Sequence, residues 1–170
     1  NEISWFDWEL AESDTGRAMM EFTRNCIAIR QQRPTLRSAE FLTATPRTVE
    51  GVPDTSWFDE TGTEMTPERW SFAEGRLLAL RRLAHSERLS HENAVAASLL
   101  LLNAYSEDRE FVLPPPYMPW RVAIDAAEPS GAPTVESAAQ RIRDNRITVA
   151  AHSAVLLVAD DVILDTGRQP

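Results

Sequence analysis

The sequence predicts a mainly β protein: an antiparallel β-sandwich that follows an α-helical segment. Beyond residue 75, apolar or alternating runs of strand length are separated by turns that contain Pro and Gly, with no helical period between most of them. Before residue 35, apolar residues recur every three or four positions, which is the period of one helix face. With 170 residues, the chain has room for one sizeable domain and an appendage.

The helical segment is predicted at residues 15–32. Residues 13–15 offer N-cap side chains, and Pro34 stops the helix because the residue before a proline is pushed out of the helical conformation. Its apolar positions are Met19, Phe22, Cys26 and Ile29. We interpret Cys26 as a small buried hydrophobe rather than a reactive thiol.

Residues 51–74 are predicted to form a connection that contains a small hairpin. Gly62 provides a turn between two short extended pieces at residues 57–58 and 63–65. Thr66 then caps a single helical turn that reaches Trp70.

The sandwich is predicted at residues 75–165. Its strands are expected at residues 76–83, 95–104, 110–114, 120–125, 147–152 and 153–160. Strict alternation places Trp120, Val122 and Ile124 on one face of their strand, and Arg121 and Asp125 on the other. Trp120 is therefore predicted to be a core residue. The stretch 135–145 is predicted to be a loop, although its composition also suits a helix.

Composition excludes several classes of partner. The net charge of −9 argues against nucleic acid, whose phosphates need a basic face. No apolar run approaches the ~18–20 residues that span a bilayer, so no membrane contact is expected. The single cysteine suits a reducing compartment, which favours a cytoplasmic location.

The residues show no pattern typical of a catalytic site, and we predict no catalytic residue, no metal and no cofactor. His85, His91 and His152 lie too far apart in the sequence for the usual metal-ligand spacing. The acidic pairs at residues 59–60 and 160–161 are interpreted as solvated charge, because catalytic carboxylates need separate rigid elements. The five tryptophans are interpreted as core or interface residues, and stacking on sugar rings is the alternative.

Four stretches resemble bacterial glycogen debranching enzymes of the isoamylase type, which are glycoside hydrolases of the α-amylase superfamily. "NEISWFDW" at residues 1–8 resembles the segment after the last barrel strand, and residues 17–37 resemble the eighth barrel helix. "SWFDETGTEMTPERW" at 56–70 is the most specific match. "LLLLNAYSEDREFVLP" at 99–114 resembles the carboxy-terminal sandwich domain.

The resemblance implies that residues 1–50 end a catalytic (β/α)8 barrel and that the chain starts inside a larger protein. The family hydrolyses α-1,6-glucosidic branch points with an Asp nucleophile and a Glu acid/base, neither of which maps onto this sequence. The expected partners are the rest of the parent enzyme and, through it, glycogen or another branched α-glucan. Asn1, Glu2 and Trp5 are the candidate substrate contacts, unless this stretch only anchors the following helix. A free-standing carbohydrate-binding module and a scaffold module are the alternatives.

Overall fold

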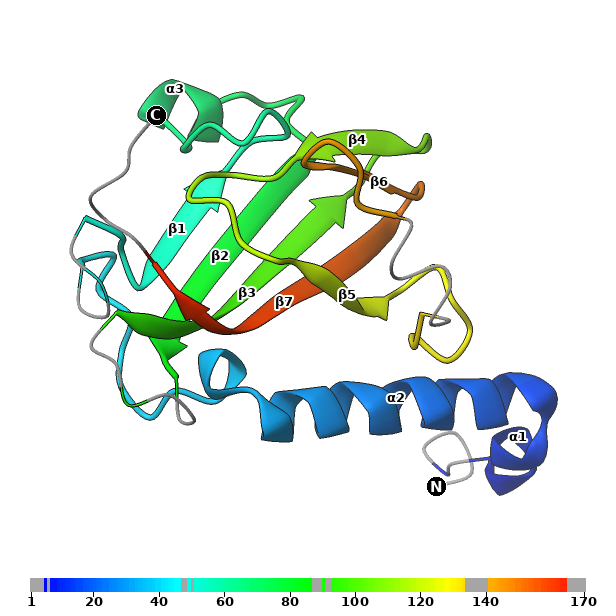
Figure 1. Ribbon diagram of the computed structural model, residues 1–170. Coiled ribbons are helices and arrows are strands. Elements are labelled where there is room, and N and C mark those ends of the chain that lie inside the picture. The colour runs from blue at the N-terminus through cyan, green and yellow to red at the C-terminus, as the bar shows by residue number, and fades with distance from the viewer. Residues whose placement is uncertain are drawn as a thin grey trace.

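The computed structural model describes residues 5, 7–46, 49, 51–86, 90, 93–133 and 141–164. In this part of the chain, seven strands form two antiparallel sheets, and the longest helix precedes all of them (Figure 1). The predicted fold class, a mainly β and sandwich-like protein, is confirmed. The origin of the helices in a barrel stays a prediction.

The helices form an arm that lies beside the sandwich in Figure 1. Helix α1 spans Trp8–Glu12, α2 spans Asp14–Gln32, and a 3-10 turn, η2, spans Pro34–Leu36. Ser13 caps α2, because its hydroxyl accepts a hydrogen bond from the Gly16 amide at 3.0 Å. The predicted helix at 15–32 is confirmed. Among the described residues, no helix has the length and apolar character to cross a membrane.

The larger sheet has five strands in the order β1-β2-β3-β7-β5, and the smaller sheet pairs β4 with β6. The strands are β1 Thr55–Phe58, β2 Leu77–His85, β3 Ala94–Asn103, β4 Arg109–Val112, β5 Arg121–Asp125, β6 Arg146–Val149 and β7 Ser153–Ile163. Every neighbouring pair is antiparallel. All six strand segments predicted beyond residue 75 are confirmed, each by one of β2 to β7.

The predicted hairpin and helical turn are also confirmed. Phe58 bridges to Glu64 across a turn in which Gly62 has φ +77°, a conformation that glycine adopts without strain. Helix α3, Pro67–Trp70, follows with Thr66 as its N-cap. Because the first arm of the hairpin is β1, the segment 51–74 supplies the edge strand of the larger sheet.

The core lies between the larger sheet on one side and the smaller sheet with residues 113–120 on the other. Residues 113–120 cross in front of β1 and β2 in Figure 1. Alternate residues of β3 face this core: Val95, Ala97, Leu99 and Leu101. The opposite layer contributes Phe111, Leu113, Met118, Trp120, Ile147 and Val149. Trp120 is only 8% exposed, so its prediction as a core residue is confirmed.

A β-bulge in β5 overturns the predicted alternation beyond Val122. Val122 pairs with Leu157, but Ile124 pairs with Leu156, so one extra residue, Ala123, is inserted in β5. Because Leu156 and Leu157 point to opposite faces of β7, Val122 and Ile124 also point to opposite faces. The prediction that Ile124 shares a face with Trp120 and Val122 is therefore wrong.

The same bulge turns Asp125 toward the core, whereas the alternation predicted it on the opposite face. Asp125 pairs with Val155, a core residue, and is 2% exposed. Its carboxylate forms an ion pair with Arg141 and accepts a hydrogen bond from the Ala127 amide at 2.9 Å. These partners compensate the cost of burying the charge.

Of the loop predicted at 135–145, residues 135–140 lie outside the described residues. Residues 141–145 lead into a tight turn, closed by a bridge between Arg143 and Arg146. Asp144 and Asn145 both have positive φ in this turn, as expected of residues that tolerate the left-handed region.

Candidate functional site

The structure leaves the predicted substrate contacts at the start of the chain untested. Asn1 and Glu2 lie outside the described residues. Trp5 is described, and 73% of its surface is exposed. Asp7 follows as the N-cap of α1 and accepts a hydrogen bond from the Glu9 amide at 3.0 Å. The role of all three candidates in substrate binding stays a prediction.

The described part of the chain was expected to hold no metal-binding cluster, and its histidines and acids are placed as follows. There, no group of three or more His, Cys, Asp and Glu side chains could hold a metal ion. His85 and His152 are exposed, and His91 lies outside the described residues.

The face of the larger sheet that points away from the core carries a cluster of leucines, which we call the leucine face. It consists of Leu78, Leu80, Leu100, Leu102 and Leu156. The strand registers place them side by side: Leu78 is opposite Leu102, and Leu100 lies between Leu80 and Leu156. All five are partly exposed.

Such a face is costly in water. Apolar surface gains about 25 cal/mol for each Å² that is removed from solvent, so covering the exposed part of these side chains is favourable. Contiguous apolar patches of this kind usually mark an interaction surface. Scattered single leucines would need no such explanation, but these come from three adjacent strands.

The helical arm already packs beside this face. A side chain at Gly131 would lie 2.7 Å from the Phe22 ring, so the absence of one lets α2 approach the loop after β5. Asn25 donates a hydrogen bond to the Ser130 carbonyl at 3.0 Å. Thr35 of η2 is buried, and η2 contacts β2 and β3.

Asp160 ties the arm to the sheet. Its carboxylate forms ion pairs with Arg33, just after α2, and with Arg121 of β5, the latter at 2.9 Å. Burial raises the pKa of Asp160, but the hydrogen bonds and charges of Arg121 and Arg33 outweigh burial, and the pKa is lowered. The interpretation of Asp160 as merely solvated charge is therefore wrong.

A second surface feature is a pair of tryptophans, which we call the aromatic corner. Trp57 of β1 and Trp70 of α3 have ring centroids 5.6 Å apart and ring planes at 76°. Trp57 is 38% exposed and Trp70 is 53% exposed. Trp57 and Trp70 are therefore not core residues, and an interface role for them stays a prediction, whereas Trp120 is a core residue.

Asp59 clamps the two halves of the aromatic corner together. This carboxylate is 3% exposed and accepts hydrogen bonds from the Thr61 amide at 2.9 Å and the Thr63 amide at 3.2 Å. It also pairs with Arg69, next to Trp70, at 3.1 Å. The interpretation of Asp59 as solvated charge is wrong. The signal in the sequence was an Asp at the start of a Gly-containing turn, where its side chain binds the backbone two residues on.

The stretch at 99–114 contains an Asn-Ala pair, and the Asn103 side chain of this pair forms several hydrogen bonds in the structure. Its side-chain amide donates hydrogen bonds to the carbonyls of Glu107, Val149 and Ala150 at 2.8, 3.1 and 2.9 Å. Its side-chain oxygen accepts one from the Tyr105 amide at 2.9 Å. The buried side chain thus joins the end of β3 to the turn between β6 and β7. Asn103 has a structural function.

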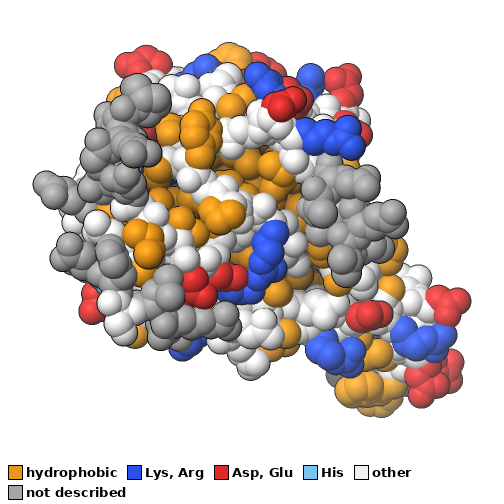
Figure 2. Space-filling view, viewed as in Figure 1, with side chains coloured by type: hydrophobic (Ala, Val, Ile, Leu, Met, Phe, Trp, Pro, Cys, Tyr) orange, Lys and Arg blue, Asp and Glu red, His pale blue; other side chains and the backbone are white. Residues whose placement is uncertain are grey.

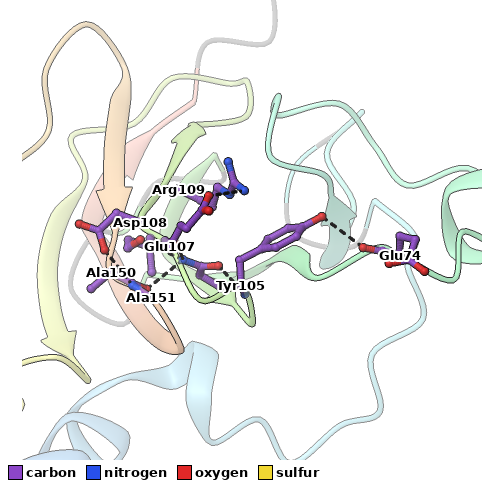
Figure 3. Close-up of polar contacts among 9 residues, drawn as sticks. Glu74, Tyr105, Glu107, Asp108, Arg109, Ala150 and Ala151 are labelled. Carbon is purple, nitrogen blue, oxygen red and sulfur yellow. Dashed lines mark hydrogen bonds and ion pairs between the residues drawn. The ribbon is translucent and has the colours of Figure 1, made fainter.

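Figure 3 shows how the loop after β3 is held on both sides. The Tyr105 hydroxyl donates to the Glu74 carbonyl at 3.2 Å, and the Asp108 carboxylate accepts from the Ala151 amide at 3.0 Å. The guanidinium of Arg109 lies 4.6 Å from the centre of the Tyr105 ring, a cation–π contact. These contacts stabilise the loop and leave the two surfaces above as the binding candidates.

No protein-family model matches this chain, and no curated protein matches it.

Proposed function

We propose that this chain is the carboxy-terminal part of a cytoplasmic, isoamylase-type glycogen debranching enzyme and that it stabilises the catalytic barrel of that enzyme. The resemblance of four stretches in the expected order supports the proposal. The confirmed β-sandwich agrees with the carboxy-terminal domain that the resemblance implies.

The leucine face is the observation that carries the proposal. A (β/α)8 barrel is surrounded by helices, and its neighbouring helices lie alongside one another. Helix α2 resembles the eighth barrel helix and already packs beside the leucine face. The helix next to α2 in such a barrel would extend the same layer and cover the leucines.

The outer surface of the arm fits the same interpretation. Met19, Met20 and Ile27 of α2 are exposed, as are Trp8 and Leu10 of α1. Figure 2 shows hydrophobic side chains on the surface, among acidic and basic ones, at the end of the molecule where α1 lies. Contacts with barrel elements would remove these side chains from water.

In this proposal, the residues that hydrolyse the α-1,6-glucosidic bonds lie in the barrel. Retaining glycosidases need two carboxyl groups about 5–5.5 Å apart, one as nucleophile and one as acid/base. In the family these stand on barrel strands that precede the segment resembled here. The present chain alone is therefore expected to release no reducing ends from branched glucan.

The test begins with the gene on the 5′ side of the Asn1 codon. We expect an in-frame barrel sequence with the Asp nucleophile and the Glu acid/base, and debranching activity from the product of the whole reading frame. An upstream frame that encodes no such barrel, or a full-length product without debranching activity, would overturn the proposal.

A substitution in the leucine face tests the docking separately. In the full-length protein, Leu100→Arg is expected to lower the melting temperature markedly, because it places a charge against the barrel. In the 170-residue chain, the half-buried Leu100 side chain retains access to water, so the same change is expected to lower the stability less than in the full-length protein. The exposed Tyr117→Arg, away from this face, is the control. Equal effects of Leu100→Arg in both proteins would contradict the docking.

A further inference from the structure

We propose that the aromatic corner, Trp57 with Trp70, is an accessory binding site for a linear α-glucan chain. This inference rests on the proposed function for the class of ligand. It adds a contact with glucan outside the catalytic barrel and assigns it to residues for which the resemblance implies no role.

The geometry of the corner suits stacked sugars. A pyranose ring presents a face of C–H groups that packs on an indole ring, while its hydroxyls stay in water. The edge of one indole ring packs on the face of the other, at 76° with centroids 5.6 Å apart. The pair therefore forms one bent aromatic surface, and a sugar ring can pack against its exposed part.

The corner is rigid before any ligand arrives. The Met65 amide donates to the Trp57 carbonyl at 2.9 Å, and the Trp70 amide donates to the Thr66 carbonyl at 3.0 Å. The buried Asp59 holds both the hairpin turn and Arg69. Because the rings are already ordered, binding loses little side-chain entropy.

Polar groups surround the exposed rings. Glu64, Thr66 and Glu68 are exposed and come from the same hairpin and helical turn. The hydrogen bond with Thr66 lowers the pKa of Glu68, so this carboxylate is ionised at neutral pH and can accept hydrogen bonds from sugar hydroxyls.

The corner borders the leucine face. Trp57, on the edge strand β1, is opposite Leu80 in the strand register, so its ring is on the same side of the sheet as the leucines, whereas Trp70 lies on α3. In the proposed docking, a barrel that covers the leucines therefore reaches Trp57 at its margin, and a glucan chain bound at the corner lies against the edge of the barrel.

Calorimetric titration of the 170-residue chain with maltoheptaose tests the inference. We expect saturable binding that Trp70→Ala weakens about tenfold, equivalent to about 1.4 kcal/mol. Arg69→Gln is expected to weaken it less, because it loosens the clamp but keeps both rings. Trp8→Ala, an exposed tryptophan on α1, is the matched control and should bind like the parent.

Indole N–H signals in a ¹H–¹⁵N spectrum provide a readout that does not depend on a variant. Maltoheptaose should shift the signals of Trp57 and Trp70 and leave that of Trp8 unchanged. Absence of binding, unchanged affinity in Trp70→Ala, or shifts confined to other tryptophans would overturn the inference. These results concern the isolated chain, so they are independent of whether an upstream barrel is found.

Discussion

Replacing Trp120 by alanine tests the sandwich core most directly. The side chain is 8% exposed and belongs to the core cluster, where the connection between β4 and β5 covers the larger sheet. Truncating a buried tryptophan costs about 3–5 kcal/mol, because apolar contacts are lost and a cavity remains. A domain is held together by only about 5–15 kcal/mol, so Trp120→Ala should remove a large share of the stability.

The expected shift is measurable in two ways. For a chain of this size, each kcal/mol moves the melting temperature by about 2–4 °C, so the variant should melt roughly 6–20 °C below the parent. Urea unfolding followed by circular dichroism gives the free energy without relying on tryptophan fluorescence. Trp120→Phe is the control: the buried indole N–H has no hydrogen-bond partner among the described residues, so phenylalanine keeps an aromatic ring and leaves no new polar group unpaired.

One result would refute the reasoning. If Trp120→Ala unfolds within about 0.5 kcal/mol of the parent, the side chain behaves as a surface residue. If that variant also loses glucan binding, Trp120 itself is the sugar platform, and both its core assignment and the aromatic corner are wrong.

Two further predictions concern the arm. Asp160→Asn should destabilise the chain by about 1–2 kcal/mol near neutral pH. Because the pKa of Asp160 is lowered in the fold, its contribution is complete above the ordinary carboxyl pKa and disappears as the pH falls through the lowered value. Urea unfolding of the parent and of Asp160→Asn at about pH 7 and about pH 3 checks this pH dependence. An equal difference between their free energies of unfolding at the two pH values would contradict the prediction. In hydrogen exchange, amides of residues 17–31 should exchange faster than those of 97–103 and 153–158, because the arm has no buried residue within α2. Equal protection would show that α2 has a further partner.

Local patterns in the sequence were enough to predict α2, α3 and the strands, but not the short helix α1 or the turn η2. Helix α2 follows from apolar spacing between a serine cap and Pro34, and each strand of the sandwich follows from a short apolar or alternating run. The hairpin with Gly62 was likewise predictable, because a left-handed turn favours glycine. Each of these signals depends on residues only a few positions apart.

The candidate surfaces were only partly predictable. The sequence suggested Trp57 and Trp70 as possible sugar contacts, but it could not place their rings 5.6 Å apart or leave them exposed. Asp59 was interpreted as solvated charge, because an acidic residue in the sequence gives no sign that its side chain is buried. Nothing in the order of residues showed that leucines of β2, β3 and β7 share one partly exposed face.

Strand register and long-range pairing were decided by the tertiary structure alone. The extra residue Ala123 turns Asp125 into the core, although the sequence alternates without interruption. Asp160 meets Arg33 from 127 positions away in the chain. Periodicity specifies which side chains lie on the same face of one element, but the partner of each face depends on how all the elements pack, and packing depends on contacts between residues far apart in the sequence.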